Sequence, residues 1–385
     1  MASFRATFLF LQAILSLAYG QDTSSTGLEA YPNCALECIV TAFGGGSCAP
    51  TNQTCICTNE QLQNNITACV TESCPIIEAL STKNISATRC GLPVRNRSGK
   101  HVSTSVSMFI FAAVFVGLRF GYKVFAKIEF GMNDWLVLAS IVATTPAIFV
   151  NVFGTASSGL GKDIWTLPPD KITDTIKYFW VATILYFLDT ALTKLSIISF
   201  YIHIFPSARV RRLLWGTFAV TSAWGFAFVV GSIVQCQPIS YFWTHWDGLH
   251  KGHCASPDGI GWSHAIMNII FDLWILAIPL SQLRKMKLHW KKKVGIAIMF
   301  FLGTFVTVVS IVRLPSLAYF TSTTNVTMNF YDLSLWSTVE VCLGIVCACL
   351  PTIRLLLVRV FPILGRTNRQ RSSEQDALIC HARRE

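Results

Sequence analysis

Seven long apolar runs dominate the chain after Lys100, and most charged residues lie between them. Each run has about the 20 residues that a helix needs to cross a bilayer. Backbone amides in lipid must bond within their own segment, so the runs predict helices. The sequence therefore predicts an all-α membrane protein with a seven-transmembrane helix bundle. The runs cover about residues 104–124, 134–153, 178–204, 213–235, 261–283, 294–320 and 333–357.

The first 20 residues have the pattern of a signal peptide. Arg5 supplies a positive start, residues 8–17 form an apolar core, and Ala18-Tyr19-Gly20 is a small-x-small cleavage site. The apolar core is too short to span a membrane. We expect export of the following segment and removal of residues 1–20.

Eight cysteines lie close together behind this signal. An even number of closely spaced cysteines in an exported segment predicts a disulfide framework, because the secretory pathway is oxidising. Zinc binding by Cys55-Ile56-Cys57 is the alternative. Spacing alone leaves about 105 pairings open. The eight are Cys34, Cys38, Cys48, Cys55, Cys57, Cys69, Cys74 and Cys90.

Charge and glycosylation patterns set the expected orientation, with the N-terminus extracellular and the C-terminus cytoplasmic. Only 13% of residues are charged, and the formal net charge of +11 comes mainly from the segments expected inside. These basic segments suit anionic lipid headgroups, and we do not interpret them as nucleic-acid binding. The basic linker Arg95–Lys100 is expected outside, which is contrary to the usual excess of positive residues on the cytoplasmic side. The five sequons all fall outside, at Asn52, Asn65, Asn84, Asn96 and Asn325.

The remaining cysteines have separate interpretations. Cys236 and Cys254 lie in one outer loop, where we expect a loop-closing disulfide, with two free thiols as the alternative. Cys342, Cys347 and Cys349 lie in the last run and are expected to be packing residues. Cys380, in the tail, is a weak candidate for palmitoylation.

Polar or charged groups inside apolar runs are costly and usually paired or functional, and we select seven of them as candidates. Depth along the helices, at about 1.5 Å per residue, predicts two ion pairs, Lys194 with Asp272 and Arg313 with Glu340. These ions either hold the bundle together or line an outer cavity that takes a ligand. His264, Asn268 and Asp272 follow one helix face as a polar stripe. The full set is Asp189, Lys194, His264, Asn268, Asp272, Arg313 and Glu340.

The N-terminal cysteines resemble the fungal CFEM domain over about residues 30–92. Pro32-Asn33-Cys34, Cys55-Ile56-Cys57 and Cys74-Pro75 carry the match, together with the other cysteine spacings. The resemblance implies a mainly helical, disulfide-rich domain. It also implies the pairs Cys34–Cys74, Cys38–Cys69, Cys48–Cys55 and Cys57–Cys90.

Position 52 bears on the cofactor that this resemblance implies. Haem-binding CFEM members use an aspartate between the third and fourth cysteines as an iron ligand, and here that position is Asn52. A neutral amide is a poorer donor to ferric iron than a carboxylate. A glycan on Asn52 would also occupy the haem position. We therefore expect no cofactor, with retained haem binding as the alternative.

The membrane part resembles the fungal rhodopsin-like seven-helix family, which includes appressorium-type receptors. The matching residues, in chain order, are Asn133-Asp134-Trp135, Lys194 to Tyr201, Cys236-Gln237-Pro238 with Cys254, Asp272 with Pro279, Gly303, Ile311-Val312-Arg313, and Glu340 with Cys349-Leu350-Pro351. The last run contains no lysine for a retinal Schiff base, so we expect no photochemistry.

These observations predict a plasma-membrane receptor that senses an extracellular cue through the cysteine-rich domain and an outer helix cavity. It would signal through basic inner loops, and a G protein is a partner implied by the resemblance alone. The alternatives are a haem- or iron-binding surface protein and a membrane enzyme, for which no catalytic motif exists. The expected domains are 1–20 signal peptide, 21–95 cysteine-rich domain, 96–103 linker, 104–357 membrane domain and 358–385 cytoplasmic tail.

Overall fold

The structure, a computed structural model, describes residues 30–46, 48–283, 290–322 and 325–360. The expected signal peptide, the basic segment at 284–289 and the tail beyond 360, with Cys380, lie outside the described residues. The chain divides into two compact units, Met1–Pro93 with Trp246–Gly248, and the remainder from Val94. The division falls close to the boundary expected at residue 95, and each unit is described by itself.

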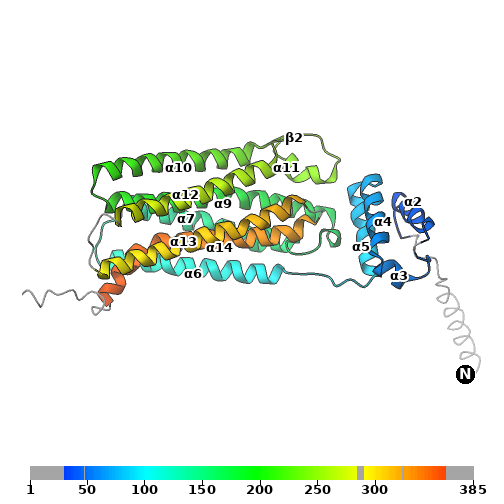
Figure 1. The fold of residues 1–385 in the computed structure, drawn as a ribbon, viewed down its shortest axis with the longest axis horizontal. Coiled ribbons are helices and arrows are strands. Elements are labelled where there is room, and N and C mark those ends of the chain that lie inside the picture. Colours follow the sequence, from blue (N-terminus) through cyan, green and yellow to red (C-terminus); the bar gives the residue numbers. More distant parts are fainter. Residues whose placement is uncertain (1–29, 47, 284–289, 323–324, 361–385) are drawn as a thin grey trace, which may run out of the picture. The chain divides into compact units, whose positions relative to one another are not determined.

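The first unit contains four short helices, labelled in Figure 1. A small apolar core joins Ala35 and Cys38 of the first helix to Val70 and Cys74. Such a small core buries little apolar surface, so cross-links supply much of the stability. The helices are α2 (Asn33–Gly44), α3 (Gln53–Thr58), α4 (Glu60–Ser73) and α5 (Ile76–Arg89).

Four disulfides cross-link these helices, and they are the four pairs that the resemblance implied. Cys48 precedes α3, Cys74 and Cys90 directly follow α4 and α5, and the other five cysteines lie on α2, α3 or α4. Each bond therefore ties two parts of the small domain together. The pairs are Cys34–Cys74, Cys38–Cys69, Cys48–Cys55 and Cys57–Cys90.

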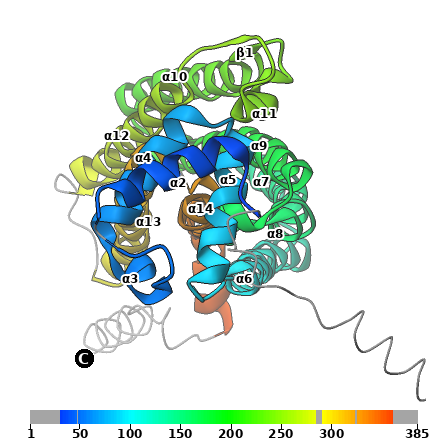
Figure 2. The same cartoon turned by 90° about the vertical axis from the view of Figure 1, so that its right-hand side faces the viewer.

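The second unit is a bundle of long helices (Figures 1 and 2). Each apolar run of the sequence corresponds to one long helix, and most helices begin several residues before the run. The second run ends in a π-helical turn, Val150–Thr155, followed by α8 (Ala156–Ser158). The long helices are α6 (Ser98–Phe125), α7 (Met132–Phe149), α9 (Pro169–Ile204), α10 (Ala208–Val234), α12 (Pro257–Leu283), α13 (Trp290–Ser322) and α14 (Val326–Val360).

Six of these helices are long and apolar enough to cross a membrane within the described residues. The seventh expected span, 294–320, corresponds to α13. Its segment Gly303–Ala318 is apolar but shorter than a full span by the same measure. The prediction of a helical multi-pass membrane protein is therefore confirmed, and the count of seven spans stays a prediction.

Helices α9 and α14 form the centre of the bundle. In their most apolar windows 56% and 61% of residues are buried. The corresponding values for α6, α7, α10 and α12 are 22–39%. Helix α10 approaches α9 closely because Gly225 has no side chain: a Cβ there would lie 2.4 Å from the Cβ of Ala191. Close approach at small residues is typical of helices packed in membranes. Most polar residues discussed below lie on or against this central pair.

The loop between α10 and α12 is held by a short antiparallel pair, β1 (Cys236–Gln237) and β2 (His253–Cys254). Cys236 lies opposite Cys254 in this pair, and the two form the expected disulfide. Between the strands lie two short helical turns, α11 (Tyr241–Thr244) and the 3-10 turn His245–Asp247.

Candidate functional site

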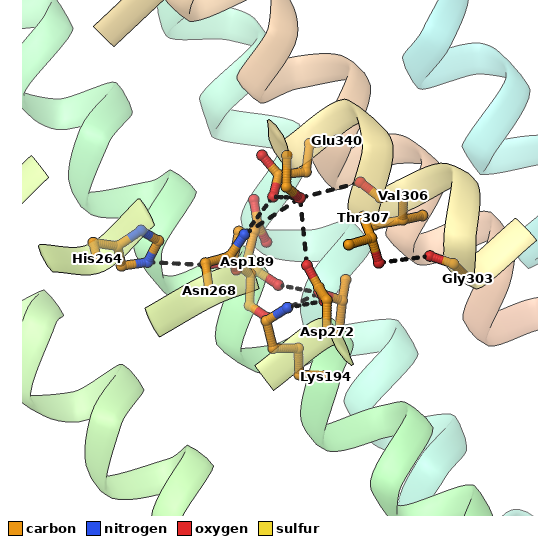
Figure 3. A network of polar contacts seen from close by, with 12 residues as sticks. Asp189, Lys194, His264, Asn268, Asp272, Gly303, Val306, Thr307 and Glu340 are labelled. Atoms are coloured by element: carbon orange, nitrogen blue, oxygen red, sulfur yellow. Dashed lines mark hydrogen bonds and ion pairs between the residues drawn. The ribbon is translucent and has the colours of Figure 1, made fainter. Parts of the chain in front are cut away.

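A continuous network of charged and polar side chains joins four helices inside the bundle (Figure 3). Lys194 of α9 forms an ion pair with Asp272 of α12. The hydroxyl of Ser310 in α13 lies 3.3 Å from the other carboxylate oxygen of Asp272. Ser310 lies in turn 2.7 Å from Glu340 of α14. The polar contacts therefore run from α9 through α12 and α13 to α14.

Glu340 is the centre of this network. Its Oε1 accepts hydrogen bonds from Asn268 at 2.6 Å and from Ser310 at 2.7 Å. Its Oε2 accepts one from the hydroxyl of Tyr186 at 3.0 Å and lies 3.3 Å from Nε of Arg313. The Arg313 guanidinium also lies over the Tyr186 ring, 4.7 Å from its centroid. Three hydrogen-bond donors and one guanidinium therefore surround this carboxylate.

The two ion pairs expected from depth along the helices are both present in the structure. Lys194 pairs with Asp272, and Arg313 pairs with Glu340. Asp189 belongs to neither pair, and its Oδ2 lies 3.2 Å from the hydroxyl oxygen of Thr144 of α7. Within the described residues, the network contains two positive and two negative groups, so its charges balance without Asp189.

His264 lies one turn from Asn268, as the polar stripe predicted, but its ring is enclosed by aromatic side chains. Phe187 stacks on it at 4.0 Å between centroids and Trp224 at 4.8 Å. Its Nε2 lies 3.5 Å from the hydroxyl of Thr190. Aromatic rings therefore fill the bundle on the N-terminal side of the network along α9 and α12.

A cavity of about 60 Å³ adjoins the network on the opposite side. It follows α9 from Thr190 to Tyr201 and α14 from Glu340 to Pro351, toward the end that carries the α9–α10 connection. That end is the one expected to be cytoplasmic. This cavity lies on the other side of the network from His264 and its aromatic neighbours. It does not test the outer cavity expected from the sequence, which stays a prediction.

The size of the cavity limits what it can hold. Pockets for drug-sized ligands are about 300–1,000 Å³, whereas a single water needs about 10–15 Å³. The cavity therefore has room for a few waters or a very small molecule in this arrangement. A larger ligand or partner segment would require the helices to separate.

A second buried charge cluster went unrecognised in the sequence. Asp134 of α7 lies between Arg119 and Lys123 of α6, with contacts of 2.8 and 2.5 Å. Arg119 also donates to the carbonyl of Ala348 in α14 at 2.6 Å. Arg119 and Asp134 are each only 1% exposed. Arg119 is therefore buried and paired inside the bundle.

The signal for this cluster was the motif Asn133-Asp134-Trp135 together with Arg119 in the previous helix. Asp134 also accepts from the backbone amide of Gly131 at 2.8 Å, which caps the start of α7. The carbonyl of Asn133 accepts from Ser196 of α9 at 3.1 Å. The motif therefore joins α6, α7, α9 and α14 at one end of the bundle.

In the N-terminal unit, Asn52 has a structural role. Its side-chain oxygen accepts a hydrogen bond from the amide of Cys55 at 3.0 Å and caps the short helix α3. The oxygen that would have to face iron is therefore already bonded to the backbone. This geometry and the neutral amide do not fit a haem ligand at position 52. Among the described residues, no three His, Cys, Asp or Glu side chains gather in a way that could hold a metal ion.

Arg89, at the end of α5, contacts residues near the start of α2 and at the start of α3. Its guanidinium lies over the ring of Tyr31, 5.1 Å from the centroid, and its carbonyl accepts a hydrogen bond from Gln53. Partial burial raises the pKa of the Tyr31 hydroxyl, and the charge of Arg89 opposes that increase. Tyr31 is therefore neutral at physiological pH.

The five sequons have different surroundings. Asn52, Asn65, Asn84 and Asn96 are exposed. Asn325 is half-buried: its amide nitrogen donates to Asp163 at 2.8 Å and its oxygen accepts from the amide of Ile164 at 3.0 Å. A glycan bonded to that nitrogen would compete with the contact to Asp163.

A clamp formed by Arg95, Asp163 and Asn325 fixes the segment that precedes α6. Arg95 pairs with Asp163 at 2.5 Å, and the amide of Arg97 donates to the carbonyl of Gly161 at 2.9 Å. Asn96 also pairs with Lys162 through the backbone. The start of the second unit is therefore bonded to the α8–α9 loop and, through Asn325, to the beginning of α14.

A small disulfide-bonded helical unit and a polytopic helix bundle with buried ion pairs together define a multi-pass membrane protein with a cysteine-rich domain. Comparison with known families gives the particular class. The chain belongs to the fungal rhodopsin domain family, which it matches over residues 118–359, and it carries a CFEM domain at residues 27–91. Both resemblances seen in the sequence are confirmed.

Curated relatives are distant and differ in their names. The chain is 25% identical to Receptor GIN3 of Arthrobotrys oligospora over 268 residues, 68% of this chain and 64% of that protein. It is 28% identical to a SAT4 family membrane protein of Emericella nidulans over 51% of this chain and 49% of the relative. The chain thus spans less than two thirds of the length of either.

The N-terminal domain has a relative of its own. A GPI-anchored hemophore of Arthroderma benhamiae is 34% identical over 89 residues, 22% of this chain and 47% of the relative. No solved structure matches the chain. Neither matched family name describes an enzyme.

Proposed function

We propose that the protein is a receptor at the plasma membrane, with the CFEM domain and the sequons outside and the basic segments inside. A receptor needs two arrangements of its helices that differ in affinity for a ligand or partner. The observation that supports this proposal most is the network from Lys194 through Asp272 and Ser310 to Glu340. It couples four helices and borders a cavity on the inner side.

The network suits a switch because its parts depend on one another. Buried ions lose their stabilisation when a partner moves away, so α9, α12, α13 and α14 shift together or not at all. The adjacent cavity supplies space on one side, next to Lys194 and Tyr201. An external cue would alter the packing of α14 or α9 from the outer end. The inner ends would then present a changed surface to a cytoplasmic partner.

One relative supports this proposal by its name: Receptor GIN3 matches 68% of this chain. A G protein is one candidate for the cytoplasmic partner. The exposed arginines Arg209, Arg211 and Arg212 at the start of α10 would face it and the anionic inner leaflet.

Haem or iron binding is the second candidate, and the hemophore relative favours it. The capped, neutral Asn52 argues against a haem ligand at that position. The two candidates differ in which unit carries the function. A receptor depends on the ion network of the bundle, whereas haem capture depends on the folded CFEM domain and needs the bundle only as an anchor.

Replacement of the gene in its fungal host separates the two candidates. Glu340→Gln in the full chain removes the charge at the centre of the network and leaves the CFEM domain untouched. The receptor proposal expects this variant to reach the surface and to fail to restore the transcriptional response lost on deletion. If deletion instead abolishes growth on haem as the iron source and Glu340→Gln restores that growth, the haem candidate replaces it.

A further inference from the structure

Asp189 is a buried acidic residue that the network does not use. It lies in the middle of α9, only 1% exposed, and its Oδ1 has no hydrogen-bond partner. Among the described residues the cations of the bundle core are bonded elsewhere: Lys194 to Asp272, Arg313 to Glu340, and Arg119 to Asp134. An ionised carboxylate in this position would therefore be both buried and unpaired, which is among the most costly states for a side chain.

The contact between Asp189 and Thr144 of α7 bears on the protonation state of Asp189. The Thr144 hydroxyl lies 2.8 Å from the carbonyl of Ser140 and 3.2 Å from Oδ2 of Asp189. A hydroxyl has one hydrogen, and a carbonyl can only accept. With that hydrogen on the closer contact, the Thr144 oxygen presents its lone pairs to Asp189. Two acceptors at this distance repel each other unless Asp189 supplies a hydrogen of its own.

We propose that Asp189 is a proton-binding site inside the bundle, with the proton on Oδ2 and donated to the hydroxyl oxygen of Thr144. The proton satisfies both oxygens of that contact and removes the unpaired charge. The other groups facing Asp189 fit this assignment. From α14 the thiol of Cys342 lies within electrostatic range. Along α9 the nearest cation is Lys194, which is bonded to Asp272.

A proton suits the site better than a metal cation. A cation needs several oxygen ligands, and Asp189 has one hydroxyl beside it. The cavity next to the ion network is lined by Thr190 and Thr193 but not by Asp189. The site therefore has neither the ligands nor the space for a hydrated ion in this arrangement.

Proton release from Asp189 would be coupled to helix movement. The anion left behind would lie between α7, α9 and α14, which form the packed centre of the bundle. It could persist only if water or a cation reached it, and either requires these helices to separate. The inference does not depend on the receptor proposal, since the same coupling would hold in a transporter or an anchor.

Infrared spectroscopy of the full-length protein in nanodiscs tests the assignment. A protonated carboxylic acid in an apolar site has a carbonyl band apart from that of carboxylates, and the band shifts in heavy water. We expect one such band in the wild type and its loss in Asp189→Asn, which has the shape of the neutral acid. Glu129→Gln, at an exposed position, serves as the folding-neutral control and should keep the band.

A second variant keeps the test valid if Asp189→Asn does not fold. Thr144→Val removes the acceptor while leaving Asp189 in place, so the band should move rather than disappear. Absence of the band in the wild type, or its persistence in Asp189→Asn, overturns the proposal. Sodium-dependent thermal stabilisation of the wild type, without the band and lost in Asp189→Asn, would instead assign the site to a cation.

Discussion

Two acidic residues in the bundle core, Glu340 and Asp189, have opposite surroundings. Glu340 has three hydrogen-bond donors and a guanidinium around it, whereas Asp189 has a single hydroxyl. The sequence predicted a pair of Glu340 with Arg313 and left Asp189 without a partner. It could not show how many donors surround each carboxyl group, because that depends on how the neighbouring helices are rotated.

The pairing of Lys194 with Asp272 predicts a specific result for charge swaps. Either Lys194→Asp or Asp272→Lys alone leaves two like charges together in the interior. Each single change should lower stability by about 3–5 kcal/mol, the usual cost of breaking a buried pair. The double swap should recover a substantial part of the stability that each single change loses. Thermal unfolding of the detergent-solubilised protein measures this, and a double variant no better than the singles would show that the pair is not an energetic unit.

Asp134 predicts a second large effect at a position where the sequence alone suggested none. Asp134→Ala leaves Arg119 and part of Lys123 without their counter-charge and removes the cap of α7. We expect retention inside the cell and a loss of several kcal/mol in stability. Glu129→Ala, three residues before Met132 and exposed, is the matched control and should change stability by less than about 0.5 kcal/mol. Equal surface levels of the two variants would contradict the structural role of Asp134.

Asn52 predicts how the CFEM domain responds to haem. Asp is as good a helix cap as Asn, so Asn52→Asp should keep the fold of the domain and supply a carboxylate. A haem titration of secreted residues 21–100, with and without glycan, measures binding by absorbance. We expect a ligated-iron spectrum only in the Asp variant. Tight binding by the natural domain would make haem sensing or uptake the leading function.

At the scale of elements, the pattern of apolar residues predicted each long helix but not how far it extends. Helix α9 begins at Pro169, nine residues before the expected span at 178, because Pro is favoured in the first turn of a helix. The π-helical turn Val150–Thr155 had no sequence signal. The position of the cavity next to Lys194 and Tyr201 also had no sequence signal, since depth along a helix does not reveal which neighbours fill the space.

The clamp at the start of α6 predicts which sequons carry glycans. Because the amide nitrogen of Asn325 is bonded to Asp163, we expect no glycan there in the folded protein. Asn325→Gln should leave the glycosylated mass unchanged, whereas Asn65→Gln and Asn84→Gln, at exposed helix positions, should each lower it by one glycan. Mass spectrometry of the intact protein decides this. A glycan found on Asn325 would mean that the clamp forms differently.

At the scale of the whole molecule, the two units have different sources of stability. The CFEM domain depends on four disulfides around a small core, and the membrane domain on packing around α9 and α14 with buried ion pairs. The sequence predicted this division because cysteines and apolar runs are separate along the chain. It could not predict that charged residues of α6, α7, α9, α12, α13 and α14 meet in two clusters, since that depends on how the helices are rotated.

We propose that the network around Glu340 stabilises one of two helix arrangements. The most direct test uses spin labels at His203, at the exposed end of α9, and at Phe301 on the exposed side of α13. Distances between the labels are measured by electron–electron resonance in full-length protein in nanodiscs. We expect one narrow distribution of the label-to-label distance in the wild type, and a second populated distance in Glu340→Gln. A single unchanged distribution in a folded Glu340→Gln protein would contradict it, and the network would then be structural only.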